Sequence, residues 1–110
     1  MRRVEKPWGY EIIWAETPHY VGKLLHINVG NRLSKQYHQT KEETVYVLKG
    51  VLYNYDQDDK IQRIMPGESF HVFPHQIHRF GAAEEDVELI EVSTNYLDDV
   101  VRLEDDYDRK

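Results

Sequence analysis

The stretch KQYHQTKEETVYVLKGVLYNY, residues 35–55, decides the fold. Apolar and polar residues alternate in Thr44–Leu48 and again in Val51–Tyr55, which is the two-residue period of strands with one buried face. Gly50 lies between these runs, and a glycine at this place favours a tight connection. The sequence therefore predicts two neighbouring antiparallel strands joined by a short turn.

The same period continues in both directions from this stretch. The polar tetrapeptide DQDD at 56–59 is typical of a hairpin tip, and the charged segment 98–110 is compatible with a short helix or an extended arm. So many short strands must close or stack to bury one face and protect their edges. We predict an all-β jelly-roll barrel that forms a single domain over residues 1–110. The predicted strands are Tyr10–Trp14, Tyr20–Val29, Lys35–Gln39, Thr44–Leu48, Val51–Tyr55, Ile61–Met65, Ser69–Phe73, Ile77–Phe80 and Val87–Thr94.

Composition excludes several classes of protein. Twenty acidic residues against fourteen basic ones give a net charge of -6, which argues against nucleic acid as a partner. No apolar run approaches the roughly 20 residues of a membrane-spanning helix, and the first residues lack a secretory signal, so we expect a cytoplasmic protein without a membrane partner. The chain has no cysteine, so any metal must bind through histidine, carboxylate or amide oxygen.

Four polar residues have the spacing of a metal site. Gln36 and His38 are two residues apart, so their side chains share one face of a strand. Glu43 can join them if the next strand pairs with theirs, and His78 offers a fourth ligand. The predicted cofactor is a divalent ion, with zinc the preferred candidate and manganese, iron, cobalt or nickel as alternatives. Spacing alone leaves open that these histidines are ordinary hydrogen-bonded groups, because short motifs match by chance.

Two stretches resemble the sequence motifs of the cupins. In GNRLSKQYHQTKEETVYVLKG, residues 30–50, the first motif keeps every spacing, with Gln36 in place of its first histidine. In GESFHVFPHQIH, residues 67–78, the second keeps its Gly-to-His interval, although Phe73 and His75 replace the usual Pro and Gly. The resemblance implies a double-stranded β-helix. It also implies a metal site formed by Gln36, His38, Glu43 and His78.

Within the cupins, four segments in order resemble the mannose-6-phosphate isomerase domain of the type II family. KPWGYE at 6–11 is similar to its opening RPWG-x-Y, and LSKQYH at 33–38 is similar to LSLQMH. GESFHVFPHQIHR at 67–79 and the closing segment 90–109 are similar to two further family motifs, although Asp108 stands at a family glycine. The resemblance implies a metal-dependent isomerase of mannose 6-phosphate and fructose 6-phosphate. No nucleotidyltransferase part is present, so guanylyltransferase activity is not expected.

An aldose–ketose isomerase needs a base and an electrophile. Glu91 is the candidate base because it interrupts the apolar strand VELIEVS, although it could equally face solvent or support other groups. Lys41, two residues before Glu43, is positioned as in related isomerases to steer a sugar oxygen, or it is a solvated charge of a turn.

Three further cations are candidates for binding the substrate. Arg79 and Arg102 match family arginines and would bind the phosphate, with Arg102 also counted among the catalytic residues. The alternative for both is ion pairing with the acidic tail. Lys23 shares the inward parity of Leu25 and Ile27 and is a further substrate-binding candidate.

Two other functions stay open beside the isomerase. One is a non-enzymatic cupin that binds a metal and a sugar or other small molecule, and the other is a metal-dependent dioxygenase, because cupins host all of these. The predicted partner is a small sugar phosphate. We also expect a homodimer, because Tyr46, Leu48, Tyr53 and Tyr55 on outward strand faces exceed what one barrel can bury.

Overall fold

The computed structural model describes residues 1–109, so Lys110, the last residue of the predicted domain, lies outside the described residues. This part of the chain is all-β, as the sequence predicts. It contains no helix that is long and apolar enough to cross a membrane. The strands are β1 (Arg2–Lys6), β2 (Gly9–Glu16), β3 (Val21–Ile27), β4 (Asn31–Arg32), β5 (Lys35–Tyr37), β6 (Glu43–Lys49), β7 (Leu52–Tyr55), β8 (Ile61–Ile64), β9 (Ser69–Val72), β10 (Arg79–Ala82), β11 (Val87–Ser93) and β12 (Val101–Glu104).

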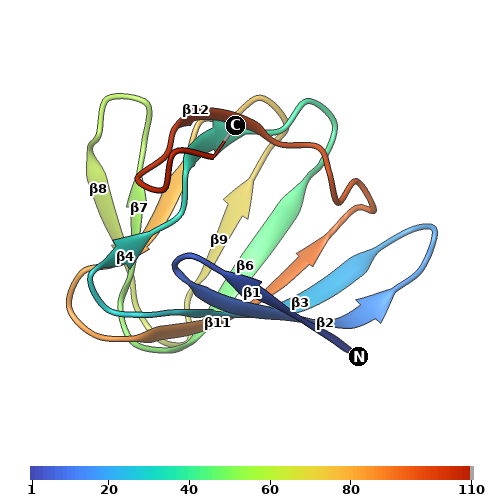
Figure 1. Ribbon diagram of the computed structural model, residues 1–110, viewed down its shortest axis with the longest axis horizontal. Coiled ribbons are helices and arrows are strands. Elements are labelled where there is room, and N and C mark those ends of the chain that lie inside the picture. The colour runs from blue at the N-terminus through green and yellow to red at the C-terminus, as the bar shows by residue number, and fades with distance from the viewer. Residues whose placement is uncertain (110) are drawn as a thin grey trace.

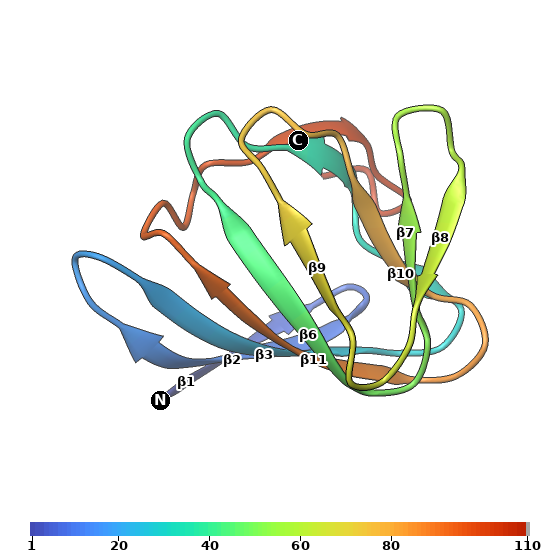
Figure 2. The same ribbon diagram turned by 180° about the vertical axis from the view of Figure 1, so that it is seen from behind.

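Two sheets form the barrel. The larger sheet has the strand order β1-β2-β3-β11-β6-β9, and the smaller has β4-β10-β7-β8, so strands far apart in the sequence are neighbours. A short pair of β12 and β5 lies with the C-terminal segment across one end of the barrel (Figure 1). The two sheets converge at the opposite end (Figure 2). The barrel is therefore closed at one end and covered by the C-terminal arm, residues 95–109, at the other.

The interior is apolar at the closed end and polar at the covered end. In the pairing of β3, β11 and β6, Leu25 lies opposite Leu89, and Leu89 lies opposite Val47. These side chains belong to the buried apolar core. Two residues further along, the inward positions are Lys23 and Glu91, which also lie opposite each other. The inward-facing side chains of the same strands therefore form both the apolar core and a buried polar site.

The predicted pairing across Gly50 is wrong. β6 lies in the larger sheet between β11 and β9, whereas β7 lies in the smaller sheet between β10 and β8. Gly50 has a φ of 79°, and an added Cβ would lie 2.2 Å from the carbonyl oxygen of Asp86, so only glycine fits this sheet-to-sheet turn. The β7–β8 hairpin around DQDD is confirmed, with Tyr55 opposite Ile61.

Several shorter elements differ from the sequence prediction. β1, β4 and β12 were not predicted as strands, and the run Tyr20–Val29 ends as a strand at Ile27. Of the alternatives for segment 98–110, the extended arm is the observed one, since β12 pairs with β5.

Two left-handed residues stand where the cupin motifs and the isomerase family have glycine. They are His75, with a φ of 69°, and Asp108, with a φ of 57°. Non-glycine residues tolerate this conformation at a modest cost. The turns are therefore kept despite the substitutions.

Candidate active site

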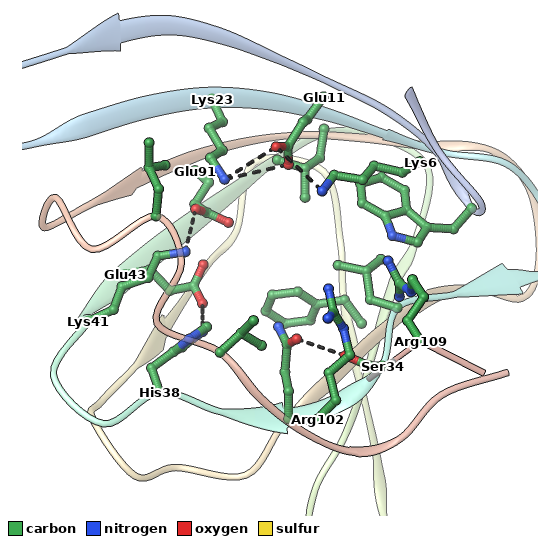
Figure 3. A pocket seen from close by; sticks show the side chains of 17 residues that line it. Lys6, Glu11, Lys23, Ser34, His38, Lys41, Glu43, Glu91, Arg102 and Arg109 are labelled. Atoms are coloured by element: carbon green, nitrogen blue, oxygen red, sulfur yellow. Dashed lines mark hydrogen bonds and ion pairs between the residues drawn. The ribbon is translucent and has the colours of Figure 1, made fainter. Parts of the chain in front are cut away.

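The polar end of the barrel encloses a cavity of about 100 Å³ that opens beneath the C-terminal arm. Of the described residues that line it, five carry cationic side chains and three carry carboxyl groups, an excess of positive charge in a chain of net charge -6. The cations are Lys6, Lys23, Lys41, Arg102 and Arg109, and the acids are Glu11, Glu43 and Glu91. Figure 3 shows these side chains converging from the larger sheet, the loop after β5 and the arm.

A group of metal-ligand type lies at one side of this cavity. His38, Glu43 and His78 are all buried, and one ligand atom from each lies within 4.8 Å of the others. The Glu43 Oε1 atom is 2.9 Å from His38 Nε2 and 3.5 Å from His78 Nε2. The sequence predicts that His38 and Glu43 come together because the two strands that carry them pair with each other. However, β5 pairs with β12 and bridges His78, and β6 pairs with β11 and β9.

The hydrogen bonds of the two histidines show that the group fits a cation. His38 Nδ1 lies 2.5 Å from the Asp99 carbonyl oxygen, and His78 Nδ1 lies 3.0 Å from that of Gln76. A carbonyl oxygen only accepts, so each Nδ1 carries the proton of its hydrogen bond and Nε2 is the ring atom that can offer a lone pair to a cation. Among residues 1–109 no hydrogen-bond partner reaches the buried His78 Nε2. Two lone pairs and a carboxylate thus meet in a buried space, which favours a divalent ion such as zinc.

Gln36, the predicted first ligand, also lines the cavity. Its main chain forms two hydrogen bonds with that of His78, which fixes the two residues side by side. Its Oε1 atom accepts a hydrogen bond from Ser34 Oγ at 2.8 Å. An amide oxygen has a second lone pair, so this bond leaves Gln36 able to act as a ligand. Ligation by Gln36 stays a prediction.

Glu91 faces the cavity and not solvent. Its side chain is buried, and one oxygen lies 3.2 Å from Lys41 Nζ. Burial, together with the nearby Glu43 carboxylate, raises the pKa of Glu91 to about 7, although Lys41 acts in the opposite direction. A carboxyl group with such a pKa can accept and return a proton near neutral pH.

The neighbours of Glu91 are themselves charged. Burial opposes ionisation of Glu43, but the Lys41 ammonium and the close contacts with the His38 and His78 rings outweigh it and hold the pKa of Glu43 well below its usual range. Burial likewise disfavours the Lys41 ammonium, but the carboxylates of Glu91 and Glu43 raise its pKa above the usual value. Lys41 is therefore a buried, charged donor in the cavity, not the solvated turn residue of the alternative interpretation.

Next to Glu91, on the adjacent strands β3 and β2, is a buried pair that the sequence only half predicted. Lys23 points inward as expected, and its Nζ atom lies 3.5 Å from both carboxyl oxygens of Glu11. Lys6 Nζ lies 4.0 Å from the same carboxyl group. Sequence reasoning missed Glu11, although its place at a position with the parity of the buried Ile13 was a usable signal.

The two arginines that were predicted to bind phosphate occupy different places in the structure. Arg102 lines the cavity. Arg79 does not, because its Nε atom donates to the Leu33 carbonyl oxygen at 2.9 Å and its Nη2 atom donates to Asp106 at 2.9 Å. Arg79 therefore forms an ion pair with the acidic tail, which was the alternative interpretation for both arginines. Arg109, which was not predicted, lines the cavity instead and is held by Asp105 at 2.8 Å.

Asp99 positions the loop between β5 and β6, and it was not predicted either. Its carboxylate accepts hydrogen bonds from the main-chain N–H groups of Gln39, Thr40 and Lys41 at 2.7 to 3.0 Å. Its carbonyl oxygen orients His38. One residue of the arm therefore fixes both a metal-ligand candidate and the lysine beside Glu91. No local sequence pattern indicates this contact across about 60 residues.

Comparison with known proteins identifies the family and the fold of this chain. The family model described as mannose-6-phosphate isomerase C-terminal matches residues 1–105. No curated relative matches the chain in sequence. Among solved structures, KdgF from Halomonas sp. has a TM-score of 0.76 at 21% identity, covering 86% of this chain and 87% of its own.

Two further structures illustrate the range of activities on this fold. A cupin sugar phosphate isomerase from Silicibacter pomeroyi has a TM-score of 0.69 at 17% identity, covering 78% of this chain and 59% of its own. The polyketide cyclase RemF from Streptomyces resistomycificus has a TM-score of 0.77 at 15% identity, covering 86% and 70%. Identities this low show the fold alone.

The fold and its buried site define the class: this is a cupin, a double-stranded β-helix with a His–Glu–His group of metal-ligand type in its barrel. The chain belongs to the mannose-6-phosphate isomerase C-terminal family, because that family's model covers nearly its whole length. The resemblance stated from the sequence motifs is confirmed.

Proposed function

We propose that this protein is a metal-dependent aldose–ketose isomerase that interconverts mannose 6-phosphate and fructose 6-phosphate through an enediol. The observation that carries the proposal is that His38 and Glu43, two members of the His38–Glu43–His78 group, line the same cavity as the buried carboxyl group of Glu91. An electrophile and a base next to each other are what proton transfer between adjacent carbons requires. Membership of the family supports the same reaction.

Different residues of the chain have different roles in the proposed reaction. His38, Glu43 and His78 would hold a divalent ion, and such an ion would supply the electrophile for the sugar oxygens. Glu91 accepts the proton from C2 of the aldose and returns it to C1. Lys41 stays protonated beside Glu91 and donates a hydrogen bond to the oxygen on which negative charge develops. The carbon skeleton is unchanged, and the step balances because the hydroxyl proton on O2 of the aldose passes to O1 as the C2 proton passes to C1.

The phosphate would bind on the far side of the cavity from Glu91. Lys6 and Arg109 project from that side, and Arg102 projects from the arm (Figure 3). A guanidinium group suits a phosphate dianion because it donates two parallel hydrogen bonds. Binding at this end would orient the reacting carbons toward His38 and Glu91. Arg102 keeps the predicted role, and Arg109 takes the place of Arg79.

A second candidate function is a non-enzymatic cupin that holds a metal and binds a sugar. The size of the cavity favours it. Pockets for small molecules usually enclose about 300 to 1,000 Å³, whereas this one encloses about 100 Å³. The arm contributes Leu97, Val100, Arg102 and Arg109 to the lining, so an isomerase would need the arm to shift when a hexose phosphate binds.

Turnover in deuterated water separates the two functions. The zinc- or manganese-loaded protein should convert mannose 6-phosphate to fructose 6-phosphate and exchange the C2 proton with solvent, and a chelator should abolish both. Unphosphorylated mannose should react poorly. Calorimetric binding of the sugar phosphate without any exchange or ketose product would instead establish the binding protein.

A further inference from the structure

We propose that Glu11 is a specificity-determining residue of the candidate site. Its carboxyl group, positioned by Lys23, accepts hydrogen bonds from two neighbouring hydroxyl groups in the middle of the sugar chain. This inference rests on the proposed isomerase function and narrows its substrate class to sugar phosphates with free hydroxyl groups on C3 and C4. The proposed reaction assigns the reacting carbons and the phosphate to other residues, so it gives Glu11 no role of its own.

Glu11 lies between the two places that the proposed reaction assigns to the ends of the substrate. Lys23 on β3 pairs with Glu91 on β11, and Glu11 is on β2, the neighbour of β3 on its other side. Adjacent strands are about 4.8 Å apart, so β2 and β11 are roughly 10 Å apart. Figure 3 shows four ionisable side chains along one wall of the cavity, in the order Glu91, Lys23, Glu11 and Lys6. A sugar with C1 and C2 at Glu91 and its phosphate near Lys6 therefore passes Glu11 with C3 and C4.

The contacts of the Glu11 carboxyl group leave it able to accept further hydrogen bonds. Lys23 Nζ lies 3.5 Å from each of its oxygens, and Lys6 Nζ lies 4.0 Å from one of them. Strong hydrogen bonds between an ammonium group and a carboxylate are about 2.7 to 2.9 Å long, so these contacts are weak. A carboxylate offers about four lone-pair positions. The two lysines therefore balance the charge of Glu11 but use its lone pairs poorly.

The burial of this pair favours a role in recognition. Glu11 is 7% exposed and Lys23 is 8% exposed, and both line the cavity. The apolar side chains of Trp8 and Leu25 belong to the same lining and to the buried core. A buried ion pair adds little to stability compared with well-packed apolar side chains of similar volume. Binding of a polar ligand explains better than stability why two charged side chains lie in this apolar wall.

The chemistry of the pair selects hydroxyl groups. A hydroxyl group can donate to a carboxylate oxygen and accept from the ammonium group of Lys23, which keeps the substrate-binding role predicted from the sequence. Two neighbouring hydroxyl groups match the two oxygens of one carboxyl group. A phosphate dianion only accepts hydrogen bonds, so Glu11 repels it and leaves it to Arg102 and Arg109. Glu11 therefore also determines which end of the sugar phosphate faces Glu91.

Steady-state kinetics with deoxy analogues test the proposal. For the metal-loaded wild type, kcat/KM should be about 10- to 100-fold higher for mannose 6-phosphate than for its 3-deoxy and 4-deoxy analogues, because each analogue lacks a hydrogen bond to a charged group. Glu11→Gln should raise KM for mannose 6-phosphate with little change in kcat, and should reduce the preference over the analogues to a few-fold. An effect on KM distinguishes Glu11 from Glu91, whose replacement should act on kcat.

Two further variants separate recognition from folding. Glu11→Gln/Lys23→Met lacks the carboxyl group but does not leave Lys23 unpaired, and it should lose the preference as well. Glu16→Gln is the matched control, because Glu16 is an exposed carboxyl group on the same strand, and it should keep the wild-type preference. A merely structural Glu11 would instead lower the rates with all three sugars by the same factor. An unchanged preference in both Glu11 variants would therefore overturn the proposal.

The reaction itself is judged separately from the role of Glu11. If wild type does not convert mannose 6-phosphate, the isomerase function is wrong, and calorimetric titration with the same three sugars tests Glu11. Tighter binding of mannose 6-phosphate than of its analogues by wild type and Glu16→Gln, but not by Glu11→Gln, would support the proposal. A wild type that treats the three sugars alike would overturn it. A wild type that binds none of them would overturn both the role of Glu11 and the proposed function.

Discussion

At the scale of single residues, the neighbours of each carboxyl group in the cavity decide what it can do. Glu43 meets two histidine rings and Lys41, which keeps it ionised as a metal ligand must be. Among residues 1–109 no histidine contacts Glu91 in this way, and burial, followed by the neighbouring Glu43 carboxylate, raises the pKa of Glu91 to about 7. Two carboxyl groups a short distance apart thus acquire the two different roles that the proposed reaction needs.

The base can be tested by replacing Glu91 with glutamine. Glu91→Gln should lower kcat by about 10²- to 10⁴-fold with little change in KM, because general base catalysis acts in the transition state. In wild type, kcat/KM should fall as pH decreases, because protonated Glu91 cannot accept a proton. A bound cation next to Glu43 lowers the pKa of Glu91, so this acidic limb should lie below the value of about 7 found without metal.

Stopped assays from pH 4.5 to 8.5 measure both effects. The acidic limb should be absent from the residual activity of Glu91→Gln. If the variant keeps wild-type kcat, or loses kcat but keeps the same acidic limb, Glu91 is not the base.

The buried pair of Glu11 and Lys23 should contribute to stability through its coupling. Glu11→Gln leaves Lys23 charged and poorly paired in the cavity, so we expect a loss of about 1 to 3 kcal/mol in the free energy of unfolding. Lys23→Met in the same chain removes the stranded charge and should restore part of that loss. Urea unfolding of the two single variants and the double variant measures the coupling. Additivity within about 0.5 kcal/mol would show that the pair is not coupled.

At the scale of elements, the C-terminal arm depends on a few polar contacts. Asp106 accepts from Arg32 at 2.6 Å and from Arg79 at 2.9 Å, and the Tyr107 hydroxyl donates to Asn31 at 2.9 Å. The arm covers the cavity end of the barrel, and β12 forms only a short pair with β5 (Figure 1). Side-chain contacts therefore hold the arm where an extended ladder does not.

Removing the charge of Asp106 should loosen the arm. Asp106→Asn weakens two charge-assisted hydrogen bonds, and a loss of 1 to 2 kcal/mol raises the open population by about 5- to 30-fold. Cleavage after Arg102 by trypsin should accelerate by a similar factor, as followed by mass spectrometry. Asp108→Asn is the matched control, because Asp108 is exposed and asparagine also tolerates its left-handed φ of 57°. Equal cleavage rates in the two variants would show that Asp106 does not hold the arm.

Local pattern and long-range contact explain which elements could be predicted. The β7–β8 hairpin follows from period and turn chemistry, which act over a few residues. The partner of β6 depends on which sheet accepts the chain after Gly50, and a two-residue period carries no information on that choice. The same limit applies to the site. His38 and Glu43 were predicted from spacing, whereas the contacts of Asp99 with Lys41 and of Arg79 with Asp106 exist only after the arm folds back.

At the scale of the whole molecule, the stabilising apolar core and the ionisable groups of the candidate site lie at different ends of the same barrel. Apolar inward positions such as Ile27 and Val87 lie at the closed end, and the ionisable groups lie at the covered end. Glu43 and His78 are nevertheless almost fully buried, and a cluster of lone pairs in such a place is destabilising unless a cation compensates it. The metal-free protein therefore carries a local energetic cost, and metal binding should change the stability of the entire domain.

Metal should accordingly stabilise the folded chain in proportion to its binding. An ion that binds only the folded state adds about 2.7 kcal/mol at 100 times its dissociation constant, which for a domain of this size raises Tm by about 10 °C. Calorimetric scans of chelator-treated protein with and without zinc or manganese measure the shift. His38→Ala should abolish it, whereas His19→Gln, at an exposed position, should keep it. An equal shift in His38→Ala would place the binding elsewhere on the chain. No shift with zinc, manganese, cobalt or nickel would remove the metal site, and with it the electrophile that the proposed isomerase reaction requires.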